Sequence, residues 1–408
     1  AAKASHTTRQ LPRRYNGPMK IVIAPQAFKG GLRAMEAARA MHEGVRRVLP
    51  AADVVLLPVA DGGDGTLEAL VSNHEVPTTS VGRPDSRPRY FDVTVTGPLG
   101  APVQASWGVM ADGKTAVIEL ARASGLALVP SERLDPLTAT TYGTGQLIQA
   151  ALNVGYRKII VGLGGSATND GAAGMAQALG ARLTDAKGRD LPWGGAALAR
   201  LHHVDLSGLN PRLKECRLLA ATDVRNHLCG TEGASMVYGH QKGATPAMVQ
   251  ELDAAMLHFA QVILQHTGVD VLSLPRAGAA GGSGAGMVAL LGAELGSGGD
   301  MVCDSLRLNA HLEGASLVLT GEGRLDGQTI YDKAPIVVAR HAAACGIPVL
   351  AIAGSLGPGY QAVLEHGITD VEATAPESTH LQEAMLNAYE LVRDAAARSV
   401  QRWYGLQT

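Results

Sequence analysis

The residues best suited to phosphate chemistry lie in one stretch, Lys158–Met175, which reads KIIVGLGGSATNDGAAGM. Its pattern predicts an apolar strand over Lys158–Leu163, a loop of small residues, and a helix from about Gly171. Glycines let the backbone approach a ligand closely, and the N–H groups that open a helix attract anions. The stretch therefore suits a phosphate-binding loop with Asp170 beside it as a base. It equally suits a tight strand-to-helix turn in which Asn169 or Asp170 only caps the helix.

Loops rich in Gly, Asp, Ser, Thr or Lys follow most of the other apolar runs. Ligands bind beyond the carboxyl ends of the strands in open parallel sheets, so these loops converge on one crevice if their strands share a sheet. Phosphoryl transfer needs Mg²⁺, which prefers oxygen ligands, and a group that orients the attacking hydroxyl. The inventory thus predicts a Mg²⁺-dependent phosphotransferase. The predicted roles are catalytic for Asp170, Lys29 and Arg324, substrate or phosphate binding for Gly164, Gly165, Ser166, Thr168, Asn169, Asp61, Gly62, Gly63 and Asp223, and metal binding for Asp64, Glu322 and Asp326.

Strands and helices must alternate to position these loops, and the hydrophobic pattern predicts that they do. Strands beginning at Met19, Asp53, Lys158, Ser316 and Pro348 are expected to form one parallel sheet. Between about Thr78 and Leu128 the pattern changes to three β-type runs separated by turns, which predicts antiparallel hairpins. We expect residues 19–80, 130–179 and 286–408 to form one domain, residues 81–129 and 180–285 to form a second α/β domain, and the active site to lie in the interdomain cleft.

One motif is misleading. Gly108–Thr115 matches the phosphate-loop pattern G-x-x-x-x-G-K-[ST], but that motif requires a strand before it and a helix after it. Here Asp112 and Gly113 are typical of a hairpin turn, and the residues after Lys114 continue as a strand. We therefore predict a hairpin at this position.

Composition excludes several classes of function. The 408 residues carry a net charge of −2 with no basic stripe, which argues against nucleic acid and membrane surfaces as partners. The four cysteines show no paired spacing, which favours reduced thiols and a cytoplasmic location. The basic segment 1–18 lacks the apolar core of a secretory signal, so a disordered tail is favoured over an organelle-transit remnant.

Seven motifs in order resemble those of bacterial glycerate kinases of type 1, from about Met19 to the C-terminus. They are ADGGDGT at Ala60, GLGGSATNDGAAGM at Gly162, ATDVRN at Ala221, YGHQKGAT at Tyr238, AGAAGGSGAG at Ala277, TGEGRLDGQT at Thr320 and AGSLG at Ala353. The resemblance implies ATP and Mg²⁺ as cofactors and D-glycerate as substrate. It implies that the first of the two expected domains is Rossmann-like and carries the second, mixed α/β domain as an insertion. It also implies 2-phosphoglycerate as the usual product and a role in organic-acid catabolism of the glycolate, glyoxylate or glucarate type. A homodimer is left open.

The chain departs from that family pattern at several positions. Gln26 and Ala27 stand where the first loop usually carries an acid and a serine, and Asp64 stands where Glu is usual. Asp332 stands before Lys333, where glycine is usual. The changes at Gln26 and Ala27 bear on activity or substrate choice if the lost acid binds metal or glycerate.

Two other functions remain open. Gly162-x-Gly164-x-x-Ala167 fits the fingerprint of a dinucleotide-dependent oxidoreductase that would act on a hydroxy acid, with Asp185 near the expected distance. However, only Arg182–Thr184 could form the strand that should present that acid. The changes at Gln26 and Ala27 also allow a non-catalytic sugar-acid sensor built on the kinase scaffold.

Overall fold

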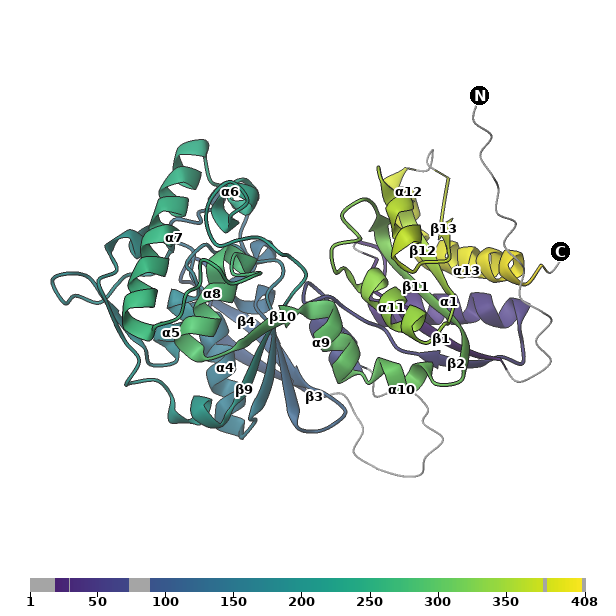
Figure 1. Cartoon of the computed structure of the whole chain (residues 1–408), viewed down its shortest axis with the longest axis horizontal. Coiled ribbons are helices and arrows are strands. Elements are labelled where there is room, and N and C mark those ends of the chain that lie inside the picture. Colours follow the sequence, from purple (N-terminus) through teal and green to yellow (C-terminus); the bar gives the residue numbers. More distant parts are fainter. Residues whose placement is uncertain (1–18, 29, 73–88, 377–379, 406–408) are drawn as a thin grey trace. The chain divides into compact units, whose positions relative to one another are not determined.

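The structure, a computed structural model, describes residues 19–28, 30–72, 89–376 and 380–405. By their contacts these residues divide into two units (Figure 1). The first comprises the described parts of Ala1–Pro58, Arg307–Ile330 and Pro335–Thr408, and the second comprises those of Val59–Leu306 and Tyr331–Ala334. Both units are α/β, as predicted. Segment 1–18 and Lys29, for which we made predictions, lie outside the described residues.

A five-stranded sheet, entirely parallel and ordered β13-β12-β11-β1-β2, forms the centre of the first unit. Its strands are β1 (Lys20–Pro25), β2 (Asp53–Leu56), β11 (Ala315–Leu325), β12 (Val349–Leu356) and β13 (Asp370–Ala373). Its helices are α1 (Ala34–Val48), α10 (Leu308–Leu312), α11 (Ala334–Ala344), α12 (Leu381–Leu386) and α13 (Ala388–Tyr404). Ile23 lies opposite Leu319 on one side and Leu56 on the other.

Helices α1 and α13 pack against one face of this sheet, where Ile21, Ile23 and Leu319 belong to the same core as Met41 of α1. Alternate strand residues such as Val22 point to the opposite face and are also fully buried. Both faces are therefore covered, which explains why the strands read as continuous apolar runs.

The second unit is built on a six-stranded mixed sheet, ordered β10-β9-β6-β5-β4-β3. Its strands are β3 (Arg89–Thr96), β4 (Pro102–Val109), β5 (Thr115–Glu119), β6 (Lys158–Gly162), β9 (Arg217–Thr222) and β10 (Glu294–Ser297), and a separate two-stranded sheet pairs β7 (Arg182–Thr184) with β8 (His203–Asp205). Its helices are α2 (Thr66–Ser72), α3 (Ala121–Ser124), α4 (Tyr142–Val154), α5 (Ala173–Ala178), α6 (Ala234–Tyr238), α7 (Pro246–Thr267), α8 (Ala279–Leu291) and α9 (Gly298–Ser305).

Within this sheet, β5, β6, β9 and β10 run parallel, whereas β3 and β4 are antiparallel to their neighbours. The predicted hairpins are confirmed. The G-x-x-x-x-G-K-[ST] match is a turn between β4 and β5, in which Asp112 Oδ1 accepts hydrogen bonds from the N–H groups of Lys114 (2.8 Å) and Thr115 (2.9 Å). No phosphate loop is present at this position, because β5 follows the turn directly.

One prediction about the sheets was wrong. The strand at Lys158, β6, pairs with β5 and β9 in the second unit and not with the strands at Met19, Asp53, Ser316 and Pro348. The boundary between the units accordingly falls after Pro58 and before Arg307, so residues 59–72, 130–179 and 286–306 join the second unit rather than the Rossmann-like domain we expected. The apolar pattern predicted the strand correctly but carried no information about its partners.

Helix ends follow local chemistry. Helix α7 begins after Thr245, whose hydroxyl accepts a hydrogen bond from the Met248 N–H (3.3 Å), carries Pro246 in its first turn, and ends at Gly268 with φ +74°. Near the C-terminus the helices α12 and α13 are separated at Asn387. In the described part of the chain, every helix is too short or too polar to span a bilayer.

Candidate active site

The loop between Ala60 and Gly65 packs directly on the end of β6. The Gly164 N–H donates to the Gly62 carbonyl (3.0 Å), and a Cβ added to Gly164 would lie only 2.4 Å from the Gly63 Cα. Gly62 has φ +93°, and a Cβ there would lie 2.5 Å from the Ala221 carbonyl at the end of β9. The glycines therefore allow two loops and one strand end to meet, and they bring Asp61, Asp64 and the 164–170 loop together as predicted.

The two acids of this first loop differ in exposure. Asp61 is 5% exposed, and its Oδ1 accepts a hydrogen bond from the Gly63 N–H (3.2 Å), which stabilises the turn. Asp64 is exposed and lies beside Gly165, because a Cβ on Gly165 would come within 2.8 Å of Asp64 Oδ1. Asp64 and Gly165 thus share the open side of the site, and only Asp64 presents a carboxylate there.

The 164–170 loop has an open half and an enclosed half. Gly164 is half-buried and Gly165 is exposed with φ +71°, whereas Thr168, Asn169 and Asp170 are fully buried. Among the described residues, no hydrogen bond engages the N–H groups of Gly165 and Ser166. Two successive N–H groups of this kind form an anion-binding concavity, so the open half is where an anion would bind.

The helix after this loop does not add to the anion site. Helix α5 begins only at Ala173, after Gly171 (φ +58°) and Ala172 (φ +60°), and has six residues. We expected the helix to begin at about Gly171 and its dipole to favour a phosphate. The positive φ of these two residues delays the helix, so an anion at this loop would be bound by backbone N–H groups such as those of Gly165 and Ser166 and not by the start of the helix.

The enclosed half of the loop is covered by the glycine-rich segment that opens α8. The Gly171 N–H donates to the Gly281 carbonyl (3.1 Å). A Cβ on Gly281, which has φ +65°, would lie 2.1 Å from the Thr168 carbonyl, and one on Gly286 would lie 1.8 Å from the Gly171 carbonyl. The motif AGAAGGSGAG therefore serves close packing of two backbones.

Asp170 is held by several donors. Its Oδ2 accepts hydrogen bonds from the Thr141 N–H (2.8 Å), the Thr141 hydroxyl (2.9 Å) and the Gly174 N–H (3.3 Å). Its Oδ1 is buried and has no hydrogen-bond partner within the described residues. Burial raises the pKa of Asp170, although the hydrogen bonds from Thr141 oppose this shift. One oxygen thus organises the loop, and the other remains available to accept a proton.

Asn169 and Lys242 connect the loop to the 230–245 region. The Asn169 Nδ2 donates to the Ser235 hydroxyl (2.9 Å). The Lys242 Nζ donates to the Ser166 hydroxyl (2.9 Å) and to the Thr168 carbonyl (2.7 Å). Lys242 is only 2% exposed, although most lysines of a folded protein are exposed. Its position between two turns gave no sign of that burial.

Sequence reasoning missed other charged groups of the second unit. Glu119, at the carboxyl end of β5, accepts hydrogen bonds from the Leu67 N–H (2.9 Å) and from Arg122 (3.0 Å). Burial raises the pKa of Glu119, and these bonds oppose the shift. Arg276 and Arg225 both contact the buried Asp332.

Asp223 follows β9 directly, two residues before Arg225, and is half-buried. Burial, and after it the charge of Asp223, raises the pKa of Tyr238. Asp223 therefore lies near Tyr238, in the 230–245 region that also contains Ser235 and Lys242.

The remaining predicted residues belong to the first unit. Thr329 donates its hydroxyl to Glu322 Oε1 (3.0 Å), and the Asp326 N–H donates to that same hydroxyl (3.1 Å). Arg324 is exposed and pairs with Asp326 (3.5 Å). Within the described ranges, no group of three or more His, Cys, Asp or Glu side chains is placed to hold a metal ion. Mg²⁺ commonly uses only one or two carboxylates together with phosphate oxygens, so these acids remain suitable ligands.

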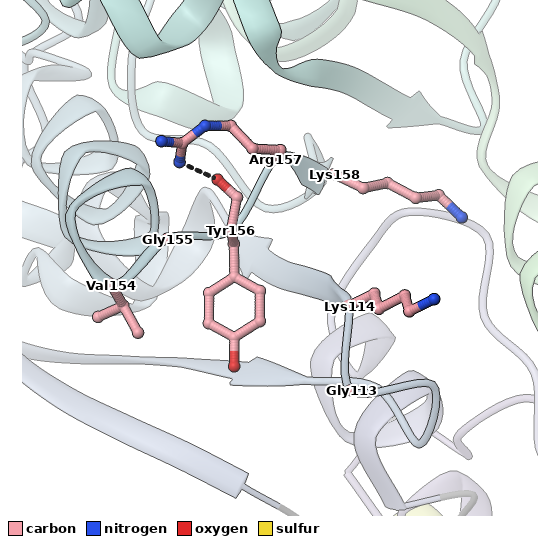
Figure 2. A pocket seen from close by; sticks show the side chains of 7 residues that line it. All are labelled: Gly113, Lys114, Val154, Gly155, Tyr156, Arg157 and Lys158. Atoms are coloured by element: carbon pink, nitrogen blue, oxygen red, sulfur yellow. Dashed lines mark hydrogen bonds between the residues drawn. The ribbon is translucent and has the colours of Figure 1, made fainter.

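A hollow of about 510 Å³ lies elsewhere on the second unit (Figure 2). It is lined by Gly113, Lys114, Val154, Gly155, Tyr156, Arg157 and Lys158. Strands β5 and β6 begin at this hollow, whereas the loop with Asp170 follows their carboxyl ends. The hollow therefore lies at the opposite edge of the sheet from the candidate site.

The oxidoreductase alternative fails on geometry. Asp185 follows β7, and β7 pairs only with β8 in a separate antiparallel sheet within the described residues. The fingerprint requires that acid at the end of a strand that neighbours β6 in the parallel sheet. In this structure β5 and β9 are the neighbours of β6.

Comparison with known proteins gives one consistent result. The model of the glycerate kinase family matches residues 21–404. The chain is 50% identical over 372 residues to the glycerate 2-kinase of Escherichia coli K12, which covers 91% of this chain and 94% of that protein. It is 48% identical to the glycerate kinase of Halalkalibacterium halodurans, over 92% of this chain and 96% of that one. A crystal structure assigned as glycerate kinase 2 from Salmonella typhimurium LT2 is 46% identical, with a TM-score of 0.82 over 96% of this chain and 100% of that one.

Proposed function

The chain belongs to the glycerate kinase family, and from this premise we propose that it transfers the γ-phosphate of ATP to the 2-hydroxyl of D-glycerate in a Mg²⁺-dependent reaction. The observation that carries the proposal is the match to the E. coli glycerate 2-kinase across 91% of this chain, which includes both glycine-rich loops. The name of that relative supports position 2 of glycerate. The unpaired N–H groups of Gly165 and Ser166 support binding of an anion at the same loop.

In the proposed reaction, the 2-hydroxyl oxygen of glycerate attacks the γ-phosphorus, the bond to the β,γ-bridging oxygen breaks, and ADP leaves. The hydroxyl proton passes to a base, for which Asp170 is our candidate through Oδ1. Burial raises the pKa of Asp170, and a carboxylate with a raised pKa is a stronger base. Because Asp170 is fully buried, the loop must open for glycerate to reach it.

Phosphate binding and charge neutralisation are divided among the other candidates. Gly165 and Ser166 would hold a phosphate through their backbone N–H groups, with Gly164, Gly62 and Gly63 supporting the loop. Lys29 and Arg324 remain our candidates for supplying positive charge. Asp64, Glu322 and Asp326 have the carboxylate oxygens that Mg²⁺ prefers, and Asp64 is exposed at the site. When bound, Mg²⁺ would neutralise charge on the phosphate oxygens.

A phosphorus NMR time course with D-glycerate, ATP and Mg²⁺ tests the proposal. The appearance of 2-phosphoglycerate together with ADP is expected, and a 3-phosphoglycerate resonance would instead correct the position of transfer. An Asp170→Asn variant should lose the product signal while still binding ATP. If the native chain forms no phosphate monoester, the kinase proposal fails. In that case a sugar-acid sensor without activity, suggested by Gln26 and Ala27, becomes the better explanation.

The proposal also covers the cellular setting. Cys216, Cys229, Cys303 and Cys345, all within described residues, are free thiols, which suits the reducing cytoplasm. We place the reaction there, in organic-acid catabolism. Cell fractionation tests the location, and light scattering on the purified protein distinguishes a monomer from a homodimer.

A further inference from the structure

Lys242 carries a positive charge in an unusual place. It ends the short 3₁₀ helix η6 (His240–Lys242), and it is among the largest fully buried side chains of the chain. The following Gly243 has φ +93°, and a Cβ there would lie 2.5 Å from the Leu134 carbonyl. This tight turn fixes the direction of the chain and keeps the lysine pointing inward. Lysine is almost never buried unless its charge is paired, so its burial here requires an explanation.

The immediate partners of the ammonium group do not balance its charge. Both acceptors, the Ser166 hydroxyl and the Thr168 carbonyl, are neutral oxygens. An ammonium group has three N–H donors, and these two bonds use only two of them. Burying a cation with neutral partners alone is unfavourable. The group therefore gains most when a negative charge is close by.

One charged group of the protein acts on Lys242. Burial lowers the pKa of Lys242 to about 7, and the charge of Asp170, from the loop after β6, opposes this shift. The carboxyl of Asp170 is itself buried and has a raised pKa, because burial disfavours its charged form. On its own turn the other titratable group is His240, whose ring Nδ1 pairs with the Ala244 carbonyl (3.2 Å). Asp170 alone therefore leaves the ammonium only partly compensated.

The backbone N–H groups of Gly165 and Ser166 offer a position for an additional negative charge. Ser166, whose side chain accepts from Lys242, is also the residue whose N–H, with that of Gly165, forms no hydrogen bond to any described residue. An anion at these two N–H groups would bind where the exposed Gly165 meets Ser166, which is only 6% exposed and whose hydroxyl accepts a hydrogen bond from the ammonium. The same residue would thus link the anion and the lysine.

We infer that Lys242 is a positioning residue. Its ammonium group holds the 164–170 loop through Ser166 and Thr168, and its positive charge is compensated when a phosphate of a nucleotide binds at Gly165 and Ser166. This inference rests on the proposed kinase function, because it takes the phosphate of ATP as the anion. It assigns a charge, and not only a packing role, to a residue that does not touch the reacting atoms.

A proton balance follows from this arrangement. Above pH 7 much of Lys242 is neutral in the free protein, and a phosphate bound nearby favours its charged form. Binding of MgATP therefore takes up a proton, and affinity weakens by up to about tenfold per pH unit as the pH rises above 7. A residue that only fills space would produce neither effect.

Calorimetric titration of the intact chain with MgATP, without glycerate, measures the uptake directly. At pH 8.0 in two buffers of different ionisation enthalpy, such as Tris and HEPES, the native protein should take up about one proton per site. The Lys242→Met variant, which is similar in length and neutral, should take up none, and its weaker affinity should not change between pH 7 and 9. Lys242→Arg keeps a permanent charge and should likewise take up no proton.

The matched control is Ser166→Ala, which removes one acceptor of the ammonium but leaves the charge and the two backbone N–H groups. It should bind MgATP more weakly yet still take up a proton. Absence of uptake by the native protein, or equal uptake by Lys242→Met, overturns the inference. If Lys242→Met does not fold, the native measurement alone decides. Failure of the kinase proposal is separate: a native chain that binds MgATP with proton uptake but forms no monoester loses the proposed function and keeps the role of Lys242.

Discussion

Replacing Gly281 with alanine tests whether the segment that opens α8 fixes the loop of Asp170. Gly281 has φ +65°, and an added Cβ would lie 2.1 Å from the Thr168 carbonyl and 2.6 Å from the Asn169 Cα. Ordinary contacts of a carbon atom lie near 3.5 Å, so the loop must move by about 1 Å or more. A displacement of about 1 Å in a catalytic group can lower a rate roughly 100-fold.

The same helix offers a matched control. Gly292, at the end of α8, has φ +69°, and a Cβ there would meet nothing within 4 Å. Both alanine variants therefore carry the cost of a left-handed non-glycine residue, roughly 1–2 kcal/mol. Only Gly281→Ala adds the clash with the loop, about 1–3 kcal/mol for overpacking. The difference between the two variants isolates the contact with Thr168 and Asn169.

Thermal unfolding and steady-state ADP formation measure the two consequences. Gly281→Ala should unfold roughly 2–12 °C below Gly292→Ala, given about 2–4 °C per kcal/mol for a domain of this size. Its kcat/KM for glycerate should fall about 10- to 100-fold, whereas Gly292→Ala should keep the native value. Equal melting temperatures and equal activities for the two variants would refute the close packing described here.

Three further outcomes are expected. Ser235→Ala leaves the buried Asn169 amide without its acceptor and should lower the free energy of unfolding by about 1–3 kcal/mol, as measured in urea; no change would mean that the bond is not formed in solution. Burial opposes ionisation of Asp332, but hydrogen bonds from Arg276 and Arg225 outweigh this effect and lower the pKa of its carboxyl. The charged carboxylate therefore stabilises the fold above pH 3.8, the pKa of the unfolded state, and this stabilisation is lost as the pH falls through the lower pKa of the folded state. The gap in melting temperature between the native protein and Asp332→Asn should therefore shrink below pH 3.8, and a constant gap would contradict it. Chelation with EDTA should abolish ADP formation and added Mg²⁺ should restore it, whereas full activity in EDTA would exclude the metal.

The limits of sequence reasoning are clear from β1 and β6. Both are short apolar runs, so their periodicity predicted both strands correctly. Their partners are set by contacts between residues far apart in the chain, such as Ile23 with Leu319 for β1 and Lys158 with Arg217 for β6, and nothing in the pattern of β6 favoured one sheet over the other. The chain also passes from the first unit to the second near Pro58 without a linker-like composition.

Burial was similarly hidden at the level of single residues. Lys242 stands in the sequence Gly-His-Gln-Lys-Gly, which is typical of an exposed turn. It is buried because its side chain reaches Ser166 and Thr168, which lie more than seventy positions away in the chain. Asp61 and Asp64 are three residues apart with the same side chain, yet one serves the turn and the other faces outward. Residue types predicted the chemistry of the loops, whereas the division of roles within each loop required the fold.

The individual glycines differ in whether they are required for packing, which the motifs alone did not indicate. A Cβ on Gly62, Gly164, Gly281 or Gly286 would strike backbone atoms within 2.5 Å, so these positions need glycine for the fold alone. Gly165 differs: it is exposed, and the nearest atom to an added Cβ would be the Asp64 carboxylate oxygen. A glycine-rich motif therefore does not by itself indicate a ligand. In this chain the proposed phosphate binding would explain Gly165, whose N–H is unpaired among the described residues, and the other four glycines position it.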